Sequence, residues 1–91
     1  MNELKYYKRN GYEFQIVQRS GNVARALGRK GKQENHEVFH VQSHNGREIA
    51  GIHVPAAEFP PSNEQWGSKG WTFSSEAQAI ERFNRLTAEQ G

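Results

Sequence analysis

The sequence predicts an α+β fold in which a small antiparallel sheet of three to four strands packs against one C-terminal amphipathic helix. Three observations lead to this prediction. Apolar and polar residues alternate over residues 12–18, two strand-like segments flank an Asn-Gly pair at positions 45 and 46, and helical periodicity begins near residue 75. A chain of 91 residues has the length of one domain, so we expect residues 1–91 to form a single domain.

The first predicted strand covers residues 12–18, where Tyr12, Phe14 and Ile16 fall on one face because side chains alternate along a strand. A turn at residues 20–22 follows, and residues 23–27 then form either a returning strand or a helical turn. Residues 1–10 are expected to be a mobile tail. Residues 28–35, rich in glycine, lysine and amides, are expected to be a flexible loop.

The Asn-Gly pair at positions 45 and 46 predicts a type I′ hairpin turn, because these residues accept two consecutive positive φ angles. With the pair as the loop, Val41 lies opposite Ala50 and Phe39 opposite Ile52. That register collects apolar side chains on one face of the hairpin. We expect this face to meet the helix.

The last third of the chain predicts a long loop and then the helix. Residues 55–71 contain all three prolines and both tryptophans, so we expect them to wrap around the domain without long regular structure. Ser75 and Gln78 have capping-box spacing, which predicts a helix over residues 75–89. The apolar stripe of this helix consists of Ala79, Ile80, Phe83 and Leu86.

The composition excludes several classes of protein. The chain has no cysteine, which excludes a disulfide scaffold and favours a cytoplasmic location, and no segment approaches the roughly 20 apolar residues that cross a membrane. Every acidic residue is a glutamate and the glutamates are scattered, while Gly28-Arg29-Lys30-Gly31-Lys32 lacks the spacing of a phosphate-binding loop. We therefore expect no catalysis and no cofactor.

The four histidines fall on the polar face of the predicted hairpin, with His40 diagonal to His53. An imidazole pair can bind a divalent metal or change charge near pH 6.5. Two histidines without a supporting carboxylate or thiolate make a weak metal site, so we expect exposed polar residues and no metal.

The N-terminal third carries eight lysines and arginines against two glutamates, Glu3 and Glu13, an excess of six positive charges. Cations alternate with aromatic rings there, a pattern typical of sites where bases stack on rings and phosphates meet basic side chains. The candidate nucleic-acid-binding residues are Lys5, Tyr7, Lys8, Arg9, Arg25, Arg29, Lys30 and Lys32. The alternative is a solvated basic surface with tyrosines packed at the sheet edge.

The two tryptophans bracket the predicted loop and have different expected roles. Trp71 adjoins the helix start, so we expect it to fill the core. Trp66 lies among prolines, glycines and amides, and we expect it to be exposed as the centre of a partner-binding surface with Phe59 and Asn63.

The sequences SNEQWG at residues 62–67 and GWTF at 70–73, with the helix at 79–86, resemble the C-terminal half of short uncharacterised proteins from phages and mobile elements. The resemblance implies a small accessory protein that binds a host complex, as inhibitors of CRISPR and other host defences do. The order of strand, turn, strand and helix from residue 37 to 86 is also similar to sheet-reading DNA-binding domains of plants and phage integrases. The insert at residues 55–70 departs from their pattern.

Two hypotheses of function result. The first is a non-catalytic accessory protein that binds a host protein or ribonucleoprotein complex, for example as an anti-CRISPR inhibitor. The alternative is a nucleic-acid-binding domain that uses the basic N-terminal third and the sheet. We also expect an unpaired sheet edge to support a homodimer.

Overall fold

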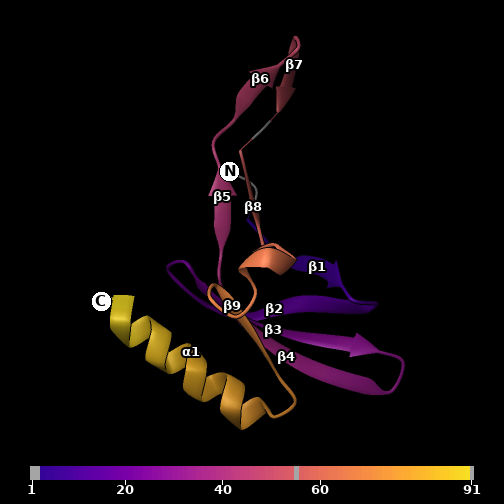
Figure 1. Cartoon of the computed structure of the whole chain (residues 1–91), viewed down its shortest axis with the longest axis vertical. Coiled ribbons are helices and arrows are strands. Elements are labelled where there is room, and N and C mark those ends of the chain that lie inside the picture. Colours follow the sequence, from indigo (N-terminus) through magenta and orange to yellow (C-terminus); the bar gives the residue numbers. More distant parts are fainter. Residues whose placement is uncertain (1–2, 55, 91) are drawn as a thin grey trace.

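The computed structural model describes residues 3–54 and 56–90 and shows an α+β fold with two parts, a body and a projecting arm (Figure 1). The body is a five-stranded antiparallel sheet with helix α1 (Glu76–Gln90) on one face, so the sheet has more strands than expected. Its strands are, in spatial order, β1 (Tyr6–Arg9), β2 (Tyr12–Ser20), β3 (Val23–Lys30), β4 (Gln33–His40) and β9 (Gly70–Phe73).

Residues 6–9 form strand β1, so the prediction of a mobile tail over residues 1–10 is wrong for this part; residues 1 and 2 lie outside the described residues. β1 joins β2 through Asn10 and Gly11, whose φ angles of 53° and 82° are the two positive values that a type I′ turn needs. The Asn-Gly signal thus operates here, at a pair that the tail prediction had passed over.

Residues 28–35 do not form the predicted flexible loop, because β3 and β4 continue through them to a tight turn at Gly31 and Lys32. Residues 23–27 belong to β3, which settles the choice between strand and helix. Glycine is needed at position 28 because the Phe14 ring lies close to the backbone there. A Cβ at this position would lie 2.2 Å from the ring.

The predicted hairpin over residues 39–54 is wrong in register. β5 (Gln42–His44) pairs with β8 (Ala57–Phe59), and β6 (Arg47–Ile49) pairs with β7 (Ile52–Val54), so these four strands form the arm that rises from the body in Figure 1. The turn lies at Ala50 and Gly51, with φ angles of 52° and 80°, while positions 45 and 46 separate β5 from β6. Phe39 lies opposite Ala24 and Gly70, because its ring is buried in the body.

The predicted wrapping loop over residues 55–71 contains more regular structure than expected. Strand β8, a 3₁₀ turn η1 (Asn63–Gln65) and the start of β9 all fall within it, and Pro55 lies outside the described residues. β9 enters the body as an edge strand beside β4, which is why this segment folds back over the sheet.

The core consists of two layers, one on each face of the sheet. Under the helix, Val23 and Val38 pack with Phe83 of α1, and Trp71 and Phe73 border them. The opposite face holds a second cluster, composed of Phe14, Ala24, Ala26, Phe39 and Val41. The expectation that the face of Phe39 meets the helix is therefore wrong, because side chains alternate and neighbouring Val38 points to α1.

The helix begins where the sequence predicts. The Ser75 hydroxyl accepts a hydrogen bond from the Gln78 backbone N–H at 3.5 Å, and Arg85 pairs with Glu81 at 3.2 Å. The helix packs against β3, β4 and β9, which leaves the β1 side of the same face farther from it (Figure 1).

Candidate functional site

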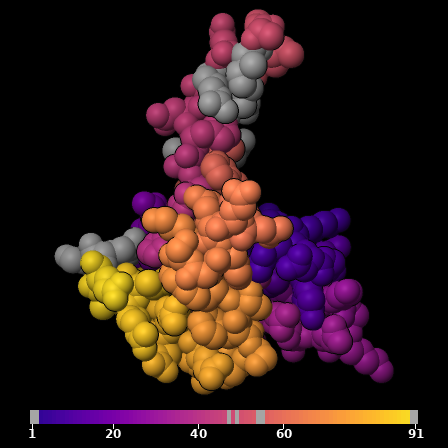
Figure 2. Space-filling view, viewed as in Figure 1, coloured from indigo at the N-terminus to yellow at the C-terminus, as the bar shows by residue number. Residues whose placement is uncertain are grey.

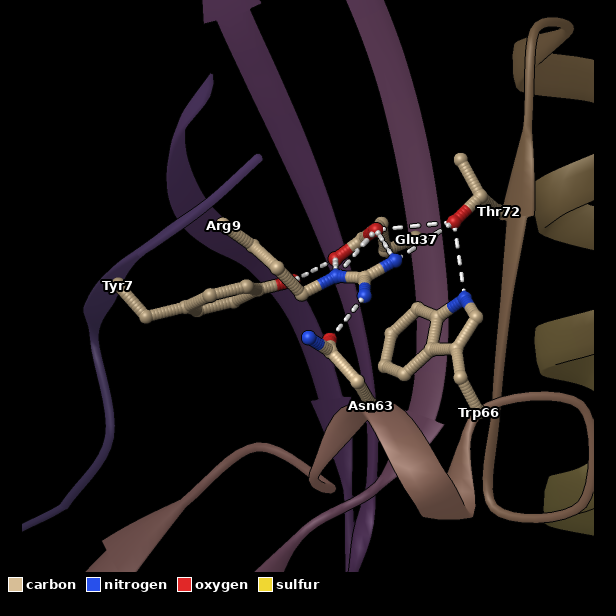
Figure 3. Close-up of polar contacts among 6 residues, drawn as sticks. All are labelled: Tyr7, Arg9, Glu37, Asn63, Trp66 and Thr72. Carbon is tan, nitrogen blue, oxygen red and sulfur yellow. Dashed lines mark hydrogen bonds and ion pairs between the residues drawn. The ribbon is translucent and has the colours of Figure 1, made fainter. Parts of the chain in front are cut away.

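A buried carboxylate joins three strands of the body on the face opposite the helix. Glu37 of β4 is 1% exposed, and its oxygens accept hydrogen bonds from the Tyr7 hydroxyl at 2.8 Å, from Arg9 Nη2 at 2.8 Å and from Thr72 Oγ1 at 2.9 Å (Figure 3). The donors come from β1 and β9, at opposite edges of the sheet. The carboxylate therefore holds the curled sheet together across its width.

Further contacts attach residues 63–66, which follow the arm, to this carboxylate. Arg9 Nη1 donates to Asn63 Oδ1 at 2.9 Å, and the guanidinium carbon of Arg9 lies 3.7 Å from the centre of the Trp66 ring. Trp66 Nε1 in turn donates to Thr72 Oγ1 at 3.0 Å, as Figure 3 shows. We call Tyr7, Arg9, Glu37, Asn63, Trp66 and Thr72 the Glu37 network.

The electrostatic interactions within the Glu37 network stabilise the contact between β1, β4 and β9. Burial first, and then the neighbouring Glu37 carboxylate, raise the pKa of the Tyr7 hydroxyl well above its ordinary range, so it stays protonated and donates. Both oxygens of Glu37 accept from strong donors, and Arg9 supplies the opposite charge. A buried carboxylate is stabilised when it is hydrogen-bonded and paired with an opposite charge in this way.

Both tryptophan rings pack against the body. Trp66 is half-buried, its ring centre lies 6.3 Å from that of Phe39, and a Cβ on Gly70 would come within 2.4 Å of the ring. The expectation that the Trp66 ring is exposed is therefore wrong, because the loop folds back and lays the ring on the sheet, while its role in partner binding stays a prediction. Trp71 borders the core under the helix, as expected, and the Arg82 guanidinium lies 4.7 Å from its ring centre.

The structure separates the three residues predicted to bind a partner. Asn63 and Trp66 belong to the Glu37 network, whereas Phe59 lies on β8 of the arm and is 41% exposed. Ile52, near the tip of the arm, is 68% exposed and was missed because the predicted register placed it in the buried face. In Figure 2 the arm extends well away from the body, and both residues belong to the arm.

The base of the arm is fixed to the body by a second ion pair. Arg19 Nη2 of β2 donates to Glu58 Oε2 of β8 at 2.8 Å, and the Leu4 backbone N–H donates to Glu58 Oε1 at 3.0 Å. The hydrogen bonds from Arg19 lower the pKa of Glu58 to about 2, despite its burial. The arm is thus anchored at its base and projects from there.

The predicted nucleic-acid-binding residues divide into two groups. Tyr7 and Arg9 are used inside the Glu37 network, and Arg25 donates to the Gln18 side chain at 3.0 Å. The other five candidates are exposed cations, namely Lys5, Lys8, Arg29, Lys30 and Lys32. Two of these have acidic neighbours, since Lys8 lies 3.9 Å from Glu13 and Arg29 lies 3.1 Å from Glu34.

The histidine pair does not form. His40 lies opposite Val23 in the body and His53 lies opposite Glu48 in the arm, because the strands pair differently from the predicted hairpin. Within residues 3–54 and 56–90, no group of three or more histidine, cysteine, aspartate or glutamate side chains is placed to hold a metal ion.

Neither a protein-family model, nor a curated protein, nor a solved structure matches this chain. In the part of the chain that the structure describes, no helix is long and apolar enough to span a membrane.

Proposed function

We propose that this chain is a non-catalytic protein-binding module that contacts its partner through the arm. The observation that carries the proposal is the exposure of Ile52 and Phe59, at 68% and 41%, on an element rooted by the Arg19–Glu58 ion pair. Large apolar side chains on a projecting element are typical of protein contacts, because their burial in a complex removes apolar surface from water.

The shape of the arm supports the same proposal. Each half of the arm is a two-stranded sheet, and such ribbons are only marginally stable alone in water. Strands β5 to β8 have their outer edges unpaired among the described residues, and unpaired edges readily take up a strand from another chain. A partner would therefore gain both apolar contacts and main-chain hydrogen bonds.

We further propose the biological setting that the resemblance of residues 62–73 implies. The chain acts as a cytoplasmic accessory protein of a phage or mobile element and binds a host protein or ribonucleoprotein complex, for example as an anti-CRISPR inhibitor of host defence. Trp66 and Asn63 of the resembling segment belong to the Glu37 network. This segment therefore helps to hold together the body, which carries the arm.

The test is capture of the partner from bacterial lysate with purified tagged protein, with and without nuclease. We expect a stoichiometric protein partner that survives nuclease, and we expect Ile52→Thr to lose it. The matched control is Val17→Thr, which changes an apolar side chain 45% exposed on the body. Equal capture by both variants would overturn the assignment to the arm.

A second candidate function is nucleic-acid binding, favoured by the five exposed cations just before and on β1, on β3 and in the turn after β3. Exposed ion pairs such as Lys8–Glu13 are weak, so phosphates can replace the glutamates. Binding to a labelled oligonucleotide should weaken steeply as salt rises, and the double variant Lys30→Ala, Lys32→Ala should reduce it. Absence of binding at about 50 mM salt would end this candidate.

A further inference from the structure

The distal half of the arm directs main-chain hydrogen-bonding groups outward. Ile49 and Ile52 are paired and flank the two-residue turn at Ala50 and Gly51. In a hairpin of this kind the residues that flank the turn bond to each other, so the next pair, Glu48 and His53, points its backbone N–H and C=O groups away from the hairpin. The outer edge of β7 therefore offers the N–H and the C=O of His53.

The edge strands of the body carry features that hinder pairing with another chain, whereas the outer edge of β7 lacks such side chains. β1 carries Lys8, whose side chain is 81% exposed, and the preceding Lys5 is exposed too. β9 is bridged at its start by Trp66 and receives a hydrogen bond from the Gly67 N–H to the Gly70 carbonyl at 2.7 Å. β7 (Ile52–Val54) contains no lysine, arginine, acidic residue or proline, the residues that usually protect an edge strand.

We propose that the outer edge of β7 pairs with the same edge of a second copy of this chain, joining two arms into one continuous antiparallel sheet. The two-fold axis passes through His53, so each His53 exchanges both backbone hydrogen bonds with its counterpart. A two-fold axis through an antiparallel strand pair makes every contact occur twice, which suits a strand that must recognise itself.

Charge favours a second copy as the occupant and favours β7 over β6. Residues 42–54 hold one arginine and one glutamate, so two arms approach without net repulsion, whereas the rest of the chain carries the net charge of +2. Pairing about His53 places position 52 of one copy opposite position 54 of the other, both apolar residues. Pairing through β6 about Glu48 would instead set two carboxylates directly opposite each other, which is destabilising.

The pairing also completes the arm. A ribbon of two strands becomes a sheet of four, and sheets of three or more strands are the ones that persist in water. The contact is small, so it belongs to the class of weak, transient interfaces below about 1,200 Å². The exposed side chain of Ile52 is brought close to the second arm in this arrangement.

The test is sedimentation of the purified protein alone from low micromolar to near-millimolar concentration. We expect a reversible monomer–dimer equilibrium, which His53→Lys should weaken by up to about fivefold because two lysines meet at the axis. Within one arm the same lysine lies opposite Glu48, so the variant preserves the hairpin. The matched control is Asn84→Lys, which adds the same charge on an exposed face of α1 and should leave the dimer intact.

Amide hydrogen exchange gives a second measurement that does not depend on any substitution. The His53 N–H should become more protected as concentration rises, while the Glu48 N–H should not. A protein that remains monomeric at near-millimolar concentration would overturn the proposal. So would a dimer that His53→Lys leaves unchanged, or one in which Glu48 is the residue protected. Since no host component is present, these outcomes are independent of partner capture from lysate.

Discussion

The body and the arm are each held by a partly buried Arg–Glu pair, but the two pairs differ in what surrounds them. Arg9–Glu37 lies in a network with Tyr7 and Thr72, and packed side chains cover it on the sheet. Arg19–Glu58 ties only the base of the arm, beyond which β6 and β7 contact little except each other. One Arg–Glu pair thus lies within the packed body, and the other lies only at the base of the projecting arm.

The difference shows how a small chain can combine stability with an accessible contact surface. The oxygens of Glu37 accept hydrogen bonds from donors on β1 and β9, so the network depends on distant strands at the same time. The arm needs only its base and its turn, and its apolar side chains remain available. Substitutions in the two regions should consequently act on different properties, stability in the body and association in the arm.

The largest effect is expected for Glu37→Ala. Removing this carboxylate leaves Arg9 partly buried without its counter-charge, and the free energy of unfolding should fall by about 3–5 kcal/mol. Urea denaturation followed by tryptophan fluorescence measures the change. Glu34→Ala is the control, because its ion pair with Arg29 is about half exposed and should contribute only about 0–1 kcal/mol. Equal losses for both variants would mean that the network does not hold the body.

Trp66→Ala should come next, with a loss of about 2–4 kcal/mol, because it removes a ring packed on Phe39 and Arg9. Trp66→Phe keeps most of the ring and loses the hydrogen bond to Thr72, so its loss should be nearer 1 kcal/mol. Thermal unfolding of the three proteins tests this order. A fully stable Trp66→Ala that lost only partner binding would instead restore Trp66 as a contact residue.

Acid should release the arm before it unfolds the body. The pKa of Glu58 is lowered from 4.5 to about 2, so its contribution to stability is complete above about pH 4.5 and disappears as the pH falls towards 2. Amide exchange at Ala57–Phe59 should therefore accelerate in that interval more than exchange in β3. Glu58→Gln should show the faster exchange already at neutral pH. If exchange at the arm base stayed constant between pH 5 and 3, the ion pair would not anchor the arm.

Ile52→Thr should have the smallest effect on stability, within about 0.5 kcal/mol, because its side chain is 68% exposed. The same variant should lose partner capture, which makes it the converse of Glu37→Ala. A large loss of stability in Ile52→Thr would mean that the tip of the arm packs within its own chain.

Periodicity and local signals predicted part of this structure. The α+β class, the strand around Phe14 and the helix start at Ser75 are confirmed, because each rests on local alternation or capping that the rest of the chain reinforces. Local signals were misleading where two Asn-Gly pairs could each form the same kind of turn. Of the two Asn-Gly pairs, Asn10-Gly11 forms the turn, and a Gly at position 51 with positive φ serves the arm.

The Glu37 network could not have been found from sequence, since its residues lie at positions 7, 9, 37, 63, 66 and 72. The one local signal concerns a contact outside the network. A glycine inside a strand pattern indicates a close approach, and at Gly28 the group that approaches is the Phe14 ring. Nothing local indicates that Glu37 is buried or that Arg9 faces it.

The fold class, the helix and the apolar faces of the central strands could be predicted, because they follow from the spacing of neighbouring residues. The tertiary structure alone set which strands pair, that Trp66 is half-buried and that residues 42–54 and 56–59 leave the body as an arm. Those outcomes depend on contacts between residues far apart in the chain. β9 takes the place beside β4 that the predicted hairpin would have filled, so the second half of that hairpin had to project.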